Sequence, residues 1–196
     1  MTCRKSKGKL RDNNKGVTFI ELVVVVAILA IMAASATYGI TMLVSADAKK
    51  ASKNLYQAVS ELRNDTLSQT GEWWGELKRT SGNGQYTFTI YRRDTDGNVV
   101  EKDKQQLGSK LTISVTGNGT TTVTDTDSVL VYFKPGSGTV DKVVSGVTNA
   151  SMLDSTSIKF TFNIASNNGL TYKLILWTNT GKIATESVSY THLRAH

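Results

Sequence analysis

Glu21 is the residue whose type and position most clearly predict a function. It opens an apolar run, residues 22–46, that contains no charged residue. A carboxylate one turn into such an apolar segment is costly in free energy, and residues of this kind usually have a functional role. The carboxylate therefore needs a partner of opposite charge, which the apolar run itself does not supply.

The element that must position Glu21 is a long helix. Residues 22–46 exceed the ~20 apolar residues that span a bilayer core, which predicts a transmembrane helix. The following residues, 47–70, are polar, with apolar or small positions every three or four residues, and no proline or glycine interrupts them. Gly71 is a plausible stop. The sequence therefore predicts one helix from near residue 18 to near residue 70.

The pattern changes from Gly82 onward to the two-residue alternation of strands. Turn residues such as Asp96-Gly97, Pro135-Gly136 and Thr180-Gly181 separate the runs. Because the separations are short, we expect neighbouring strands to pair in an antiparallel sheet. The predicted strands include residues 86–91, 111–115, 129–133, 158–162 and 174–177.

Charge and cysteine content limit the classes of function. Six basic residues and Asp12 give residues 1–16 a net charge of +5, which leaves +2 of the total +7 for the rest. Cys3 is the only cysteine, so no disulfide framework or thiolate metal site is expected. Both histidines, His192 and His196, lie in the last five residues, and no motif of a hydrolase or metalloprotease is present. We therefore expect a protein that is not an enzyme and has no cofactor or metal.

The junction Lys15-Gly16-Val17-Thr18-Phe19-Ile20-Glu21, followed by the apolar run, resembles the class III signal sequence of type IV prepilins and type II secretion pseudopilins. The resemblance implies that a membrane aspartyl peptidase cuts between Gly16 and Val17 and then methylates the amino group of Val17. A glycine suits the cut because it lets the peptidase approach the backbone closely. Valine departs from the phenylalanine that is usual at the position of Val17. The resemblance also implies that Glu21 pairs with the new amino group of a neighbouring subunit during filament assembly.

The same resemblance implies a life cycle and a set of partners. The chain would be a single-pass protein of the cell membrane with a cytoplasmic N-terminus, and later part of an extracellular or cell-envelope filament. Its partners would be the prepilin peptidase and methylase, other pilin or pseudopilin subunits, an assembly platform with its ATPase, and membrane lipid before assembly. Residues 54–65, 129–136 and 174–182 resemble the helix and strands of minor pseudopilins, although they also suit any antiparallel hairpin protein.

We therefore predict an α+β fold, with a long N-terminal helix packed through its distal half on a C-terminal antiparallel sheet. The predicted segments, in chain order, are a basic leader, a transmembrane and filament-core segment, an amphipathic distal helix, a β domain and an atypical tail. Their bounds are residues 1–16, 17–46, 47–71, 72–188 and 189–196.

Three alternatives remain open at this point. An ordinary secretory signal peptide is supported by the small residues Ala34-Ser35-Ala36, although the uncharged run continues past them. A single-pass anchored binding module, such as an adhesin that never polymerises, is a second possibility. The third is a competence pseudopilus component that binds DNA, which the near-neutral charge after residue 16 does not favour. Secretion, motility, adhesion and DNA uptake all remain open as roles of a filament.

Other candidate sites have simpler structural explanations. Asp94-Thr95-Asp96-Gly97-Asn98 hints at a calcium loop, but its glycine is at the fourth position rather than the sixth, so a hairpin turn is expected. Trp73-Trp74 is expected to pack where the helix meets the sheet rather than to bind a ligand. Asp125 and Asp127 are no stronger as calcium ligands. The basic pairs Lys78-Arg79 and Arg92-Arg93, which have aromatic residues near them, are expected at solvated strand and loop positions rather than in a DNA-binding site.

Overall fold

The structure is a computed structural model that describes residues 18–117, 119–146, 158–166 and 170–188. Within the helix it gives the backbone but not the side chains of residues 34–45. The predicted leader, the predicted cut between Gly16 and Val17 and the atypical tail lie outside the described residues. The chain divides into two units, Met1–Ile40 and Thr41–His196, and each is described here by itself.

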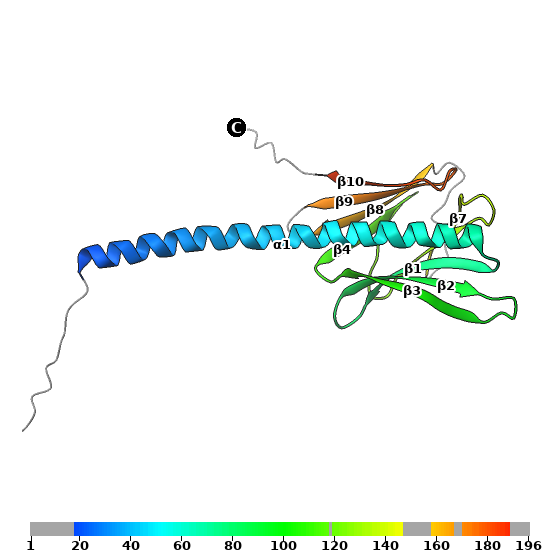
Figure 1. Ribbon diagram of the computed structural model, residues 1–196, viewed down its shortest axis with the longest axis horizontal. Coiled ribbons are helices and arrows are strands. Elements are labelled where there is room, and N and C mark those ends of the chain that lie inside the picture. Colours follow the sequence, from blue (N-terminus) through cyan, green and yellow to red (C-terminus); the bar gives the residue numbers. More distant parts are fainter. Residues whose placement is uncertain (1–17, 118, 147–157, 167–169, 189–196) are drawn as a thin grey trace, which may run out of the picture. The chain divides into compact units, whose positions relative to one another are not determined.

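Helix α1 runs from Phe19 to Ser68 and confirms the single long helix predicted from the sequence (Figure 1). It ends just before Gly71, whose φ of 117° lies in the left-handed region. A side chain at Gly71 would also meet the Arg93 carbonyl oxygen at 2.8 Å. Because only glycine adopts such a conformation without strain, Gly71 fixes the point at which the chain leaves the helix.

The part of α1 in the first unit exposes apolar side chains. Phe19 is 84% exposed and Ile20 is 72% exposed, and the large apolar residues from Leu22 to Met32 are also exposed. Over the residues with described side chains, which leave out 34–45, no helix is long and apolar enough to cross a membrane. The apolar run 22–46 predicted from the sequence therefore lies partly outside the described side chains.

Within its described residues, the second unit forms two antiparallel sheets of five strands each. The first sheet has the order β3-β2-β1-β6-β7. Its strands are β1 (Glu72–Thr80), β2 (Gln85–Arg93), β3 (Val99–Gly108), β6 (Val129–Phe133) and β7 (Val140–Ser145).

The second sheet has the order β10-β9-β8-β4-β5. The predicted strands at residues 111–115, 158–162 and 174–177 lie in this sheet. Its strands are β4 (Leu111–Thr116), β5 (Thr120–Thr122), β8 (Lys159–Ser166), β9 (Thr171–Trp177) and β10 (Ile183–Val188).

The presence of two sheets departs from the single sheet expected from the sequence. The chain passes from one sheet to the other between β3 and β4, where only Ser109 and Lys110 separate strands that do not pair with each other. Both sheets bury one face, so strands of either sheet have the same alternation of buried and exposed residues. The alternation therefore predicts strands correctly without showing which sheet they join.

One hydrophobic core joins the distal half of α1 to both sheets. The helix contributes the three- and four-residue series predicted from the sequence, and Ala48, Leu55 and Leu62 are fully buried. The first sheet contributes Phe88 and the second contributes Phe160, both also fully buried. The predicted packing of a long N-terminal helix on antiparallel β-structure is therefore confirmed, and it gives an α+β fold.

Gly75 in β1 lies close to the side chains that pack between the first sheet and the helix. A Cβ at this position would overlap the Phe88 ring and would come within 3.0 Å of Leu62. We expect Gly75→Ala to destabilise the second unit by about 1–3 kcal/mol, because the extra methyl group overpacks a full core. Thermal unfolding of the full chain in detergent, followed by circular dichroism of the β-structure, measures this loss.

Gly119→Ala is the matched control, because a Cβ on Gly119 would meet no atom within 4 Å. The control should unfold within a degree or two of the wild type. Equal melting temperatures for the two variants would contradict the close approach of β1 and α1 at Gly75.

Candidate functional site

The start of α1 is closed by reciprocal hydrogen bonds between Thr18 and Glu21. The backbone nitrogen and the hydroxyl of Thr18 each donate to Oε2 of Glu21 at 3.3 Å. The backbone nitrogen of Glu21 donates to the Thr18 hydroxyl, also at 3.3 Å. This arrangement is a capping box, in which side chains satisfy amide groups that the first helical turn leaves unpaired. The same carboxylate also interacts favourably with the positive end of the helix dipole.

The carboxylate of Glu21 lies among exposed apolar side chains. Among the residues that the structure describes, Glu21 forms no ion pair. Its neighbours Phe19, Ile20 and Leu22 are all exposed apolar residues. The start of α1 thus presents a negative charge beside exposed apolar side chains, and the role of Glu21 in filament assembly stays a prediction. The predicted cut and methylation positions, Gly16 and Val17, lie outside the described residues.

The capping role of Glu21 was missed in the sequence, although its signature is present there. A threonine followed three residues later by a glutamate, just before an apolar run, is the pattern of a capping box. Thr18 therefore belongs to the candidate site as the residue that holds the Glu21 side chain close to the helix start.

The residues from Asp94 to Asn98 form the predicted hairpin turn between β2 and β3. Asp94 accepts hydrogen bonds from the backbone nitrogens of Asp96 at 3.0 Å and Asn98 at 2.8 Å. The hydrogen bond from the Asn98 backbone is the main reason that the pKa of Asp94 is lowered. The Asp94 oxygens thus shape the turn.

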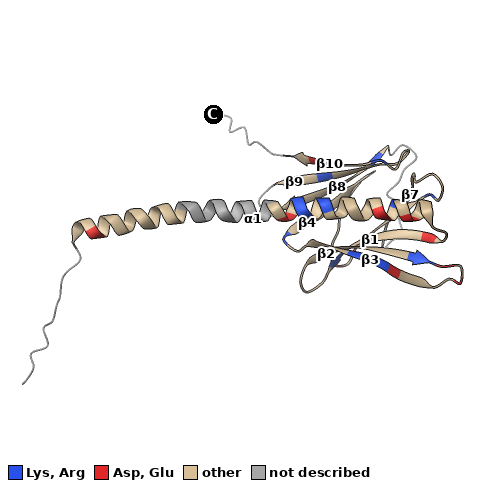
Figure 2. Ribbon diagram, in the orientation of Figure 1, with Lys and Arg blue, Asp and Glu red and all other residues tan. Residues whose placement is uncertain are grey.

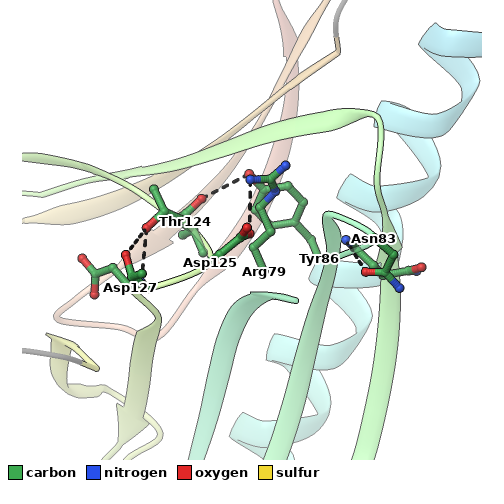
Figure 3. Close-up of polar contacts among 9 residues, drawn as sticks. Arg79, Asn83, Tyr86, Thr124, Asp125 and Asp127 are labelled. Carbon is green, nitrogen blue, oxygen red and sulfur yellow. Dashed lines mark hydrogen bonds and ion pairs between the residues drawn. The ribbon is translucent and has the colours of Figure 1, made fainter. Parts of the chain in front are cut away.

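The loop before β6 holds Asp125 and Asp127 through protein contacts (Figure 3). Asp125 pairs with Arg79 at 3.2 Å. Asp127 accepts a hydrogen bond from the Ser145 hydroxyl at 2.8 Å, and its backbone nitrogen donates to the Thr124 hydroxyl. Within the described part of the chain, no group of three or more acidic, histidine or cysteine residues is placed to hold a metal ion.

The two adjacent tryptophans point to opposite faces of β1. Trp73 is buried in the core shared with α1, so the predicted packing between helix and sheet is confirmed for this residue. Trp74 is half-buried on the other face, where its ring stacks between Tyr91 and Tyr132 at centroid distances of 5.6 and 6.1 Å. For Trp74 the prediction is wrong, because neighbouring residues of a strand alternate between faces. Burial is the largest influence on both tyrosines and raises the pKa of each.

The arginines of the basic pairs in the first sheet contact neighbouring side chains. Arg79 pairs with Asp125, and Arg93 forms an ion pair with Glu72 at 2.7 Å. The guanidinium of Arg92 lies over the Trp73 ring, 5.5 Å from its centroid. Figure 2 shows basic and acidic residues interspersed over the strands and the distal half of α1.

Arg63 links the distal half of α1 to two loops that the sequence did not connect. Its Nε donates to the Gly138 carbonyl at 2.9 Å and its Nη2 donates to the Thr180 carbonyl at 3.4 Å. These carbonyls belong to the β6–β7 and β9–β10 turns, which contain the predicted turn residues Pro135-Gly136 and Thr180-Gly181. One side chain therefore holds a turn of each sheet against the helix.

Comparison with known proteins agrees with the site at the start of α1. Residues 11–37 match the family model described as the prokaryotic N-terminal methylation motif. This match confirms the resemblance of the segment to the N-terminal sequences of type IV prepilins and type II pseudopilins. The matched segment includes the start of α1, whose distal half packs on antiparallel sheets.

The comparison with solved structures found one similar chain. It is the minor pseudopilin EpsH from the type 2 secretion system of Vibrio cholerae, with 13% sequence identity and a TM-score of 0.45. The alignment covers 72% of this chain and 97% of that chain. No curated protein matches the sequence significantly.

Proposed function

We propose that this chain is a structural subunit of a type IV pilus or of a type II secretion or competence pseudopilus. In this proposal the prepilin peptidase cuts the leader between Gly16 and Val17, and the new amino group of Val17 is methylated. The processed subunit then assembles into a filament through α1. The observation that supports the proposal most is the match of residues 11–37 to the N-terminal methylation motif.

The physical basis of assembly in this proposal is the surface at the start of α1. The exposed apolar side chains from Phe19 to Met32 need an apolar environment. Lipid supplies it before assembly and neighbouring subunits supply it in the filament. The basic residues before Gly16 favour a cytoplasmic location for the leader, which gives a single-pass protein with its second unit on the opposite side of the membrane.

Glu21 sets the register between subunits in this proposal. Its carboxylate and the amino group of Val17 in a neighbouring subunit are each costly to bury alone, and pairing them reduces this cost. A peptidase, a methylase, other pilin-like subunits, and an assembly platform with its ATPase are the partners that this route requires. The role is structural, without a reaction catalysed by the chain itself.

The N-terminus of the mature protein tests the proposal directly. We expect mass spectrometry of the protein purified from its own cells to find a chain that begins at N-methylated Val17. A chain that begins at Thr37 would instead indicate an ordinary signal peptide cleaved after Ala36. Retention of residues 1–16 would favour the anchored binding module that never polymerises. Either result would overturn the proposed processing.

A further inference from the structure

A groove of about 370 Å³ lies between α1 and the strands β9 and β10, within the second unit. Its helix wall includes Lys49, Ser52, Lys53 and Tyr56. Its strand wall includes Tyr172 and Glu186. The size is at the lower end of the range of about 300–1,000 Å³ that is usual for small-molecule sites.

Ser52 lines the groove through atoms other than its hydroxyl oxygen. The residue is 3% exposed, its Oγ exposes less than 1 Å², and among the described residues Oγ has no hydrogen-bond partner. A ligand in the groove does not reach this oxygen, so its recognition depends on the charged side chains of the two walls.

The charged groups of the groove are divided between its two walls. Lys49 and Lys53 are one helical turn apart on α1, and both side chains are exposed. Among the described residues, neither lysine forms an ion pair, and Glu186 on the opposite wall forms none either. Two ammonium groups suit a phosphate, and the carboxylate suits an amine. The groove is therefore complementary to a ligand that carries a phosphate and an ammonium group.

The position of the groove along α1 suggests the source of such a ligand. The uncharged run ends at Ala46, so Lys49 and Lys53 follow it by about 4.5 and 10 Å at 1.5 Å per residue. Figure 2 shows the first basic residues of α1 directly after the stretch without described side chains. If the apolar run spans the membrane, as the proposed function requires, these lysines lie at the depth of the lipid headgroups.

We propose that the groove binds the headgroup of an amine-bearing phospholipid, such as phosphatidylethanolamine, while the subunit is still in the membrane. Lys49 and Lys53 hold the phosphate, and Glu186 holds the ammonium group. The inference rests on the proposed function, because it takes the apolar run as the membrane anchor. It adds a lipid-binding site that secures the second unit at the membrane surface before assembly.

The test uses the full chain in nanodiscs that contain equal amounts of phosphatidylethanolamine and phosphatidylglycerol. Native mass spectrometry then identifies the lipids that stay bound to the released protein. We expect the wild type to retain one phosphatidylethanolamine. The double variant Lys49→Gln with Lys53→Gln should retain it at least tenfold less often. Glu186→Gln should keep a bound lipid but lose the preference for the amine-bearing one.

Lys50→Gln is the matched control, since Lys50 is an exposed lysine of the same helical turn that does not line the groove. Equal lipid retention by this control and by the double variant would overturn the site. Equal retention of both lipids by the wild type would overturn the role of Glu186.

A separate measurement distinguishes failure of this site from failure of the proposed function. Resistance of the full chain to extraction from membranes by alkaline carbonate reports the anchor alone. Binding of a short-chain phosphatidylethanolamine to the full chain in detergent solution tests the groove alone. If the chain resists carbonate extraction but does not bind phosphatidylethanolamine selectively, only the proposed lipid site is contradicted. If carbonate extracts the chain but it still binds this lipid selectively, only the proposed membrane anchor is contradicted.

Discussion

Glu21→Gln is expected to abolish filament assembly while leaving the start of α1 intact. Glutamine is accepted at the third position of a capping box, so the contacts with Thr18 can persist. The substitution removes only the negative charge, which in the proposed assembly leaves the amino group of a neighbouring Val17 buried without a partner. Loss of one partner of a buried pair costs about 3–5 kcal/mol, which corresponds to roughly a hundredfold or more in the assembly equilibrium. The loss is measured by shearing cells and comparing the amount of subunit in the sheared fraction with the amount left in the membrane.

Thr18→Ala is the matched variant that removes the cap and keeps the charge. We expect it to cost only about 1 kcal/mol of helix stability and to leave most assembly intact. Glu21→Val should insert into the membrane as well as the wild type or better, because it removes a charge that costs about 2.5–3.5 kcal/mol on insertion scales. It should nevertheless fail to assemble. Equal shearing of Glu21→Gln and wild type would contradict the register role of the carboxylate.

Gly16→Leu is expected to block processing almost completely. The reason is steric: a peptidase that must approach the backbone before Val17 tolerates no bulky side chain at the scissile bond. Unprocessed chain, longer by residues 1–16, should accumulate in the membrane fraction. Gel mobility and mass spectrometry of that fraction report the proportion of chain that is cut.

Gly16→Ala supplies the graded control, because a single methyl group should slow the cut only modestly. Gly8→Leu carries the same bulky change at another glycine of the leader, away from the expected cut, and should be processed normally. Processing of Gly16→Leu at the wild-type rate would show that the peptidase cuts elsewhere.

The local elements could be predicted from the sequence because their signals are local. The spacing of Ala48, Leu55 and Leu62 follows the helical period, and all three residues are in the core. The two-residue alternation identified strands such as β4 and β8. The division into two sheets could not be predicted, because it depends on partners far apart in sequence. The role of Gly75 depends in the same way on Phe88 and Leu62, which no local pattern connects to it.

The candidate site was predictable to a similar degree. Glu21 stands out from the sequence alone because a carboxylate in an apolar run is rare. Thr18 and Glu21 together have the sequence pattern of a capping box. Composition and hydropathy alone do not reveal this pattern. The groove beside Ser52 could not be predicted, because its walls come from α1 and from strands more than a hundred residues later. Only the packed second unit brings these residues together.

The contacts of Arg63 have a consequence for the order in which the chain folds. Its two carbonyl partners lie 75 and 117 residues further along the sequence. Contacts of such long range form late, because a large loop must close before they stabilise anything. The helix emerges first during synthesis, but the guanidinium of Arg63 has both acceptors only after the β9–β10 turn has formed. Docking of α1 thus requires the β9–β10 hairpin, so a chain that ends before this hairpin lacks the fully docked helix.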